Sequence, residues 1–174
     1  MRNPVCISLL ALTGAVVAGA PAFAHITLET REAPAGSYYK AVFSVPHGCA
    51  GSATTKIRVR IPEGVVGVKA QPKPGWKLET IKEKLAKPIA GEGGRTITEG
   101  VTEIAWSGGK LLDENFDQFV MQVRLPDTPA TTLYFPVVQE CEKGINRWIE
   151  TPATGASGGE GKMPAPSLRL TAKS

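Results

Sequence analysis

Glycine and proline residues divide this chain into short segments in which apolar and polar residues alternate. Thr54 to Ile61 is the clearest case, because every second residue from Ile57 onward is apolar and basic residues stand between them. Side chains of an extended strand point alternately to its two faces, so this segment presents one face to a core and the other to water. No segment shows a sustained helical period, and the core must therefore form between sheets.

Similar patterns recur along the chain at the regular spacing of an all-β domain. They fall at Ile26–Glu29, Tyr38–Val45, Val65–Ala70, Trp76–Ile81, Thr96–Thr98, Val101–Trp106, Phe116–Leu125, Leu133–Val138 and Arg147–Ile149. Lys82–Gly94 is polar and contains glycine and proline, so we expect it to form a mobile hairpin tip. Short strands separated by Gly/Pro turns predict an antiparallel β-sandwich of the fibronectin type III or immunoglobulin kind.

Residues 1–24 have the parts of a secretory leader. Arg2 supplies the positive charge, Val5–Ala20 is a short apolar run, and Pro21–Ala24 ends in an A-x-A cleavage signature. The run is rich in glycine and alanine, whereas a transmembrane helix needs about 20 strongly apolar residues. A retained membrane anchor is the alternative. We therefore predict a signal peptide over residues 1–24, cleavage after Ala24, and a periplasmic or secreted mature protein.

Cleavage would leave 150 of the 174 residues, which is the length of one domain. We expect the sandwich to span residues 25–151. Residues 152–174 begin with a stretch that is poor in apolar residues and rich in glycine and proline, which predicts a loose tail. Ser167–Thr171 alternates enough to pair as an edge strand. No hydrophobic segment follows it, so we expect no membrane anchor once the leader is removed.

Cys6 lies in the leader, so Cys49 and Cys141 are the cysteines of the mature chain. In an exported protein an even number of cysteines indicates disulfide pairing. The bridge would join residues 92 positions apart. By restricting the unfolded chain it would stabilise the fold by roughly 4–5 kcal/mol. A two-thiolate metal site is the alternative.

Charge and motif content argue against several function classes. Loss of Arg2 lowers the formal net charge from +4 to +3, and the basic residues are dispersed, which does not fit nucleic-acid binding. The chain has no G-x-S-x-G elbow, Walker loop or dinucleotide fingerprint. Its two histidines, His25 and His47, cannot build a three-histidine metal site. We therefore expect that the protein is not an enzyme.

His25 would be the first residue of the cleaved chain. A histidine there can bind one metal ion through both its α-amino nitrogen and its imidazole, which closes a chelate ring. These nitrogen ligands suit Cu(II), which favours tetragonal N/O coordination that a carboxylate would complete. The alternative is an incidental histidine after the cleavage site. His47, next to Gly48 and Cys49, is interpreted as a loop residue beside the disulfide.

The acidic stretch Asp113–Phe119 is the candidate source of that carboxylate. In a regular strand Asp117 would share a face with the core residue Phe119. A bulge or bend near Asp117 would re-aim its side chain at a site. A solvated turn is the alternative for this stretch. Trp148 lies on a late strand, where it is either a core residue or a ring that shields a metal from water.

Several of these segments, taken in order, resemble one known family. They are Ala24-His25, Pro72–Trp76, Ile104–Gly109, Phe116–Phe119, Phe135–Cys141 and Arg147–Glu150. In this order they resemble the YcnI family of exported copper-binding domains. The resemblance covers nearly all of the mature chain and rests on the joint order of the motifs.

The resemblance implies a β-sandwich of the same kind and one Cu(II) at a site called a monohistidine brace. There the amine and imidazole of an N-terminal histidine bind the ion, an acidic residue adds an oxygen, and a tryptophan lies close. On this chain the brace matches His25 and the tryptophan matches Trp148. The acidic ligand falls within Asp113–Asp117, with Glu114 and Asp117 as the candidates.

A metallochaperone-like role in copper trafficking or homeostasis follows as the expectation. Its partner would be another periplasmic or membrane copper-handling protein. One alternative is an oxidative copper enzyme, but such terminal-histidine sites use a second histidine, and His47 has no established place at this site. The other alternative is a sandwich domain that binds an exported protein and has no physiological metal.

Overall fold

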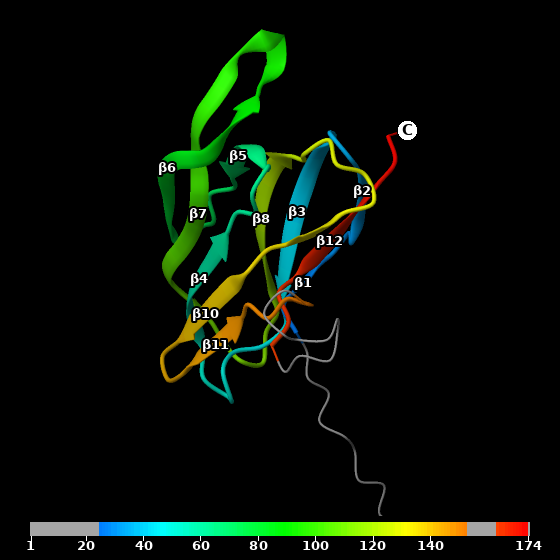
Figure 1. Cartoon of the computed structure of the whole chain (residues 1–174). Coiled ribbons are helices and arrows are strands. Elements are labelled where there is room, and N and C mark those ends of the chain that lie inside the picture. Colours follow the sequence, from blue (N-terminus) through cyan, green and yellow to red (C-terminus); the bar gives the residue numbers. More distant parts are fainter. Residues whose placement is uncertain (1–24, 153–162, 174) are drawn as a thin grey trace, which may run out of the picture.

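The structure is a computed structural model that describes residues 25–152 and 163–173 (Figure 1). Two sheets form most of the domain, one with strand order β1-β3-β8-β5 and one with order β11-β10-β4-β7-β6. All pairings within these two sheets are antiparallel. The predicted antiparallel sandwich is therefore confirmed. The predicted leader, residues 1–24, and residues 153–162 of the predicted tail lie outside the described residues.

The strand bounds follow the sequence patterns at Tyr38–Val45, Thr54–Ile61, Val65–Ala70 and Phe116–Leu125, whereas the single strand expected over Leu133–Val138 is divided between two sheets. The first sheet holds β1 (Thr27–Leu28), β3 (Tyr38–Val45), β5 (Val66–Ala70) and β8 (Asp117–Arg124). The second holds β4 (Thr54–Arg60), β6 (Lys77–Ala90), β7 (Thr96–Leu111), β10 (Val137–Cys141) and β11 (Ile145–Trp148). A third, small sheet contains β2 (Glu32–Pro34), β9 (Thr132–Tyr134) and β12 (Ser167–Thr171). Across the described ranges, no helix is long and apolar enough to cross a membrane.

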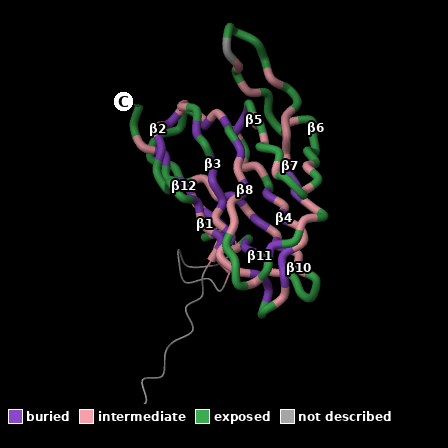
Figure 2. Tube along the Cα trace, turned by 180° about the vertical axis from the view of Figure 1, so that it is seen from behind, coloured by how far each residue is buried: buried purple, intermediate pink, exposed green. Residues whose placement is uncertain are grey.

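The core lies between the two large sheets, where alternate side chains point inward. Ile57 and Val59 of β4 are fully buried, and Phe119 and Val123 of β8 are buried opposite them. The rings of Phe119 and Trp106 meet edge to face, with centroids 5.5 Å apart. Figure 2 shows the buried positions concentrated along β3, β8, β4 and β10. Period-2 alternation thus sets which side chains form the core.

Residues 167–171 form a strand, but the expectation that it lies at an edge is wrong. β12 pairs with β2 in parallel and with β9 in antiparallel orientation, so both of its edges are hydrogen-bonded. Leu168 and Leu170 are fully buried and belong to the main core. Burial of these two side chains explains why the segment returns to the sandwich. The packed domain therefore extends to Thr171, beyond the boundary expected at residue 151.

The hairpin of β6 and β7 is longer than the sequence pattern indicates. Residues 82–90, expected in a hairpin tip, continue β6, and the turn is confined to residues 91–95. Pro88 is tolerated because β6 is the edge strand of its sheet. The strand expected to end at Trp106 also continues as β7 through Leu111. Backbone hydrogen bonds between β6 and β7 extend both strands into segments whose polar side chains do not predict a strand.

Cys49 and Cys141 form the predicted disulfide. Their sulfur atoms are 2.06 Å apart and their Cα atoms 6.0 Å apart. The bridge joins the loop after β3 to the end of β10. It therefore ties the first sheet to the second covalently, and it removes these cysteines as free thiolate ligands.

Candidate functional site

His25 lies two residues before the start of β1 and packs against Trp148. The ring centroids are 5.4 Å apart, and the ring planes meet at 73°, an edge contact. His25 leads into the first sheet, where Thr27 of β1 pairs with Ser44 of β3, whereas Trp148 ends β11 of the second sheet. The sandwich thus brings together two of the residues selected from the sequence. These two are separated by more than one hundred residues along the chain.

Trp148 is fixed within the core. Its side chain is only 3% exposed, and its indole Nε1–H donates to Gln139 Oε1 over 3.0 Å. Trp148 also stands opposite Val137 in the β10–β11 register. The Trp148 ring that contacts His25 is therefore buried and hydrogen-bonded to Gln139, while His25 itself is partly exposed.

A cavity of about 350 Å³ opens beside His25. Its lining combines charged and hydroxyl groups with proline rings: Arg31, Tyr134, Glu150, Pro152, Pro164 and Pro166. Glu150 lies two residues after Trp148. Its backbone N–H donates to Met163 O over 3.1 Å, and its carbonyl accepts the Ala165 N–H over 2.9 Å. The Glu150 carboxylate accepts the Met163 N–H at Oε2 over 3.3 Å, and the residue lines the same cavity as His25.

Asp117, an acidic candidate from the sequence, is engaged elsewhere. Its Oδ1 lies 2.6 Å from Lys73 Nζ and also accepts the Gln118 N–H over 2.8 Å. The β3–β8 register continues without a shift to the pair Val45–Asp117, so the expected bulge at this position is wrong. The Lys73 ammonium pairs with this partly exposed carboxylate, and the strand continues without distortion. The other candidate, Glu114, is exposed in the turn between β7 and β8.

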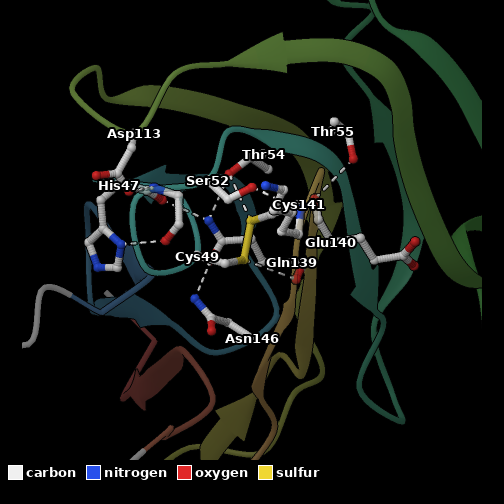
Figure 3. Close-up of a disulfide and its surroundings, with 12 residues drawn as sticks. His47, Cys49, Ser52, Thr54, Thr55, Asp113, Gln139, Glu140, Cys141 and Asn146 are labelled. Atoms are coloured by element: carbon white, nitrogen blue, oxygen red, sulfur yellow. Dashed lines mark hydrogen bonds between the residues drawn. A yellow bond between two sulfur atoms is a disulfide. The ribbon is translucent and has the colours of Figure 1, made fainter.

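A third residue of the acidic stretch, Asp113, contacts the loop that carries His47. Asp113 Oδ1 accepts the Gly48 N–H over 2.9 Å, and His47 Nδ1 lies 2.6 Å from Gly48 O. Figure 3 shows His47 and Asp113 together at one side of the disulfide. His47 thus occupies the loop position beside Cys49 that its sequence context predicts.

Within residues 25–152 and 163–173, no three side chains of His, Cys, Asp or Glu gather closely enough to hold a metal ion. A metal at His25 would therefore need a donor other than these side chains. The α-amino nitrogen that the predicted cleavage after Ala24 would create is a donor of that kind.

Sequence reasoning missed Gln139 and Glu150. Gln139 has a recognisable signal, because it is a polar residue in phase with the buried Val137 of β10. Glu150 has a weaker one, since only its spacing from Trp148 relates it to the site. What brings Glu150 to the cavity is the return of the chain at Met163–Ala165, which no local pattern indicates.

Comparison with known proteins supports both the fold and the family. A solved structure of an uncharacterized protein from Nocardia farcinica, described as an immunoglobulin-like fold, aligns with a TM-score of 0.63 at 25% identity. This alignment covers 84% of the present chain and 98% of that chain. The copper-binding protein CutI of Bacillus subtilis (strain 168) is 32% identical over 108 residues. That match covers 62% of this chain but 47% of CutI, about half of its length.

The family match covers the packed domain almost completely. Residues 25–170 match the model described as "Domain of unknown function (DUF1775)". The match begins at His25 and ends within β12, so it includes the late strand that completes the core. The chain therefore belongs to the DUF1775 family, and its resemblance to the YcnI family is confirmed.

Proposed function

We propose that the mature chain, cleaved after Ala24, binds one Cu(II) through the α-amino nitrogen and imidazole of His25. The observation that carries this proposal is the position of His25, partly exposed at a cavity and packed against the buried Trp148. The start of the family match at His25 supports it, as does the similarity to a protein named for copper binding. Two nitrogen donors in one chelate ring are well suited to Cu(II).

A carboxylate oxygen completes the site in this proposal. The chain offers two sources for it. One is the acidic stretch, with Glu114 and Asp117 as the candidates that the family resemblance implies. The other is Glu150, which lines the same cavity as His25. Asp117 would first have to leave Lys73, whereas Glu150 would have to give up a hydrogen bond from the Met163 N–H to its Oε2.

Copper trafficking is the function that this arrangement supports best. A partly exposed ion with few protein ligands is accessible to a competing ligand from another protein. Trp148 covers one side of His25, and the cavity leaves another side open. We infer a periplasmic or secreted protein that is not an enzyme and that exchanges Cu(II) with another copper-handling protein, in trafficking or homeostasis.

Proton competition gives this site a defined pH dependence. Both the α-amine and the imidazole must be deprotonated to bind, so metal binding releases protons. Copper affinity should therefore fall as the pH is lowered and the two nitrogens become protonated.

The decisive experiment is electron paramagnetic resonance of the chain that begins at His25, loaded with one equivalent of Cu(II). We expect a tetragonal signal with nitrogen couplings. Acetylation of the His25 α-amino group removes the amine nitrogen from the chelate ring and should abolish this signal. The loss of affinity should exceed the roughly 10–100-fold that removal of an outer-shell partner costs. An unchanged signal would contradict the proposal and favour a protein-binding sandwich with incidental copper.

Single variants then identify the oxygen donor. Glu114→Gln, Asp117→Asn and Glu150→Gln each remove one carboxylate while nearly preserving side-chain size. The variant that changes the copper signal while leaving the His25 couplings intact identifies the donor. If none of the three changes it, the oxygen ligand is water or another group.

A further inference from the structure

Gln139 is a fully buried polar residue close to the contact between His25 and Trp148. It lies on β10 with no solvent exposure. Burying an amide without hydrogen-bond partners is unfavourable, so a glutamine in a core requires an explanation from its surroundings. Hydrophobic side chains occupy most of the other inward positions of this core.

Every hydrogen-bonding position of the Gln139 amide is used. Its Nε2 donates to His47 O over 2.7 Å and to Thr54 Oγ1 over 2.8 Å. Its Oε1 accepts from Trp148 Nε1 over 3.0 Å and from Asn146 Nδ2 over 3.3 Å. An amide has two donor hydrogens and two acceptor lone pairs, so no capacity remains. Figure 3 shows Gln139 and its partner Asn146 beside the disulfide.

The partners also fix which way the amide faces. An indole N–H can only donate, so the group facing Trp148 must be Oε1. A backbone carbonyl can only accept, so the group facing His47 must be Nε2. Rotating the amide by half a turn would break both bonds, and the side chain therefore has one orientation.

We propose that Gln139 is a positioning residue of the metal site. It holds the Trp148 ring at the angle at which it contacts His25, and it fixes the His47 loop relative to that ring. The disulfide cannot do this, because it restrains the backbone at Cys49 and Cys141 but not the side-chain torsions of Trp148. The expected effect of Gln139 on copper affinity rests on the proposed copper function. The positioning of the Trp148 ring by Gln139 does not depend on it.

The test compares Gln139→Met with Thr54→Val in the chain beginning at His25. Gln139→Met keeps an unbranched side chain and removes all four hydrogen bonds. Thr54→Val removes one partner of Nε2 and leaves the bonds to Trp148 and His47, so it controls for loss of stability alone. In metal-free protein, nuclear Overhauser contacts between the His25 and Trp148 rings report the positioning directly.

We expect Gln139→Met to weaken these ring contacts and to lower Cu(II) affinity by roughly 10–100-fold, as loss of an outer-shell partner does. Thr54→Val should retain both. Unchanged ring contacts and unchanged affinity in folded Gln139→Met would overturn the inference. If Gln139→Met does not fold, hydrogen exchange of the Trp148 Nε1–H in the wild-type protein serves instead. Slow exchange is expected because this N–H donates to Gln139 Oε1, and exchange at the rate of a free indole would overturn the inference. Wild-type protein that shows the ring contacts but binds no copper would refute the proposed function and leave the positioning role standing.

Discussion

The two ends of this sandwich are held together in different ways. At the end that carries His25, a disulfide, a saturated buried amide and a ring contact join segments that are distant in sequence. At the other end the β6–β7 hairpin projects beyond the sheets (Figure 1). None of the 14 residues of β6 is buried, and this strand pairs with β7 alone.

The difference shows what each kind of interaction can specify. Backbone hydrogen bonds suffice to extend the outer part of this hairpin, where the side chains are exposed or only partly buried. They do not set the angle of a side chain, which needs packing or directed hydrogen bonds. The disulfide, the hydrogen bonds of Gln139 and the ring contact all lie at the end of the domain where His25 packs against Trp148.

Removing the disulfide should give the largest effect. Replacing Cys49 and Cys141 by serine should lower the free energy of unfolding by roughly 4–5 kcal/mol, because the unfolded chain regains the freedom of a long loop. For a domain of this size the melting temperature should fall by roughly 10–20 °C. Calorimetry of the mature chain measures both quantities.

A shortened hairpin is the matched comparison for that measurement. Replacing residues 84–99 by a tight two-residue turn between Glu83 and Gly100 should change the free energy of unfolding by no more than about 1 kcal/mol, because this region is mostly exposed. If the shortened hairpin loses more free energy of unfolding than the serine variant, the hairpin contributes more to stability than the disulfide, which would contradict the comparison between the two ends.

Alkaline pH should destabilise the cross-linked core by a smaller amount. Tyr39 of β3 is 6% exposed and donates its hydroxyl to Thr30 O. Burial and, secondarily, the Glu29 charge raise the pKa of Tyr39 from 10.0 to about 12. Stability is fully present below pH 10 and is lost as the pH rises toward 12, because the unfolded tyrosine ionises first. The loss should reach up to about 3 kcal/mol.

Denaturant unfolding between pH 9 and pH 12 tests this dependence. Tyr39→Phe should lack this component of the pH dependence, while the shortened hairpin should keep it, since Tyr39 lies outside the replaced residues. An equal pH dependence in wild type and Tyr39→Phe would assign the alkaline loss to other groups.

Alanine substitutions at two neighbouring glycines of β7 should have the smallest effects on stability. They test whether the base of the hairpin packs against the core. A Cβ on Gly109 would lie 2.1 Å from Trp76 Cε2, so Gly109→Ala should displace that ring and cost about 2 kcal/mol. A Cβ on Gly108 would meet nothing within 4 Å, but its φ of +79° is unfavourable for alanine and should cost about 1 kcal/mol.

Chemical unfolding and tryptophan fluorescence distinguish these two variants. Gly109→Ala should shift the emission of the folded protein, because Trp76 moves, and Gly108→Ala should not. If both variants lose the same stability with no spectral change, the base of the hairpin is not packed against the core as the structure indicates.

Local patterns predicted most strands correctly and failed where pairing decided the outcome. The alternation in β4 and β8 identified Ile57, Val59 and Phe119 as inward-facing. The same rule gave the wrong position to β12, because alternation does not reveal how many neighbours a strand has. It also predicted a bulge at Asp117, because the compensating Lys73 lies 44 residues earlier and no local pattern points to it.

The sequence by itself determined the all-β class, the cysteine pair and the candidacy of His25 and Trp148. Period-2 alternation, cysteine number and a cleavage signature are local properties that can be read in order along the chain. Only the tertiary structure decided that Trp148 lies against His25, that Glu150 shares the cavity and that Gln139 holds the indole. Alternation specifies the face to which a side chain points, whereas sheet pairing and packing specify what it meets there.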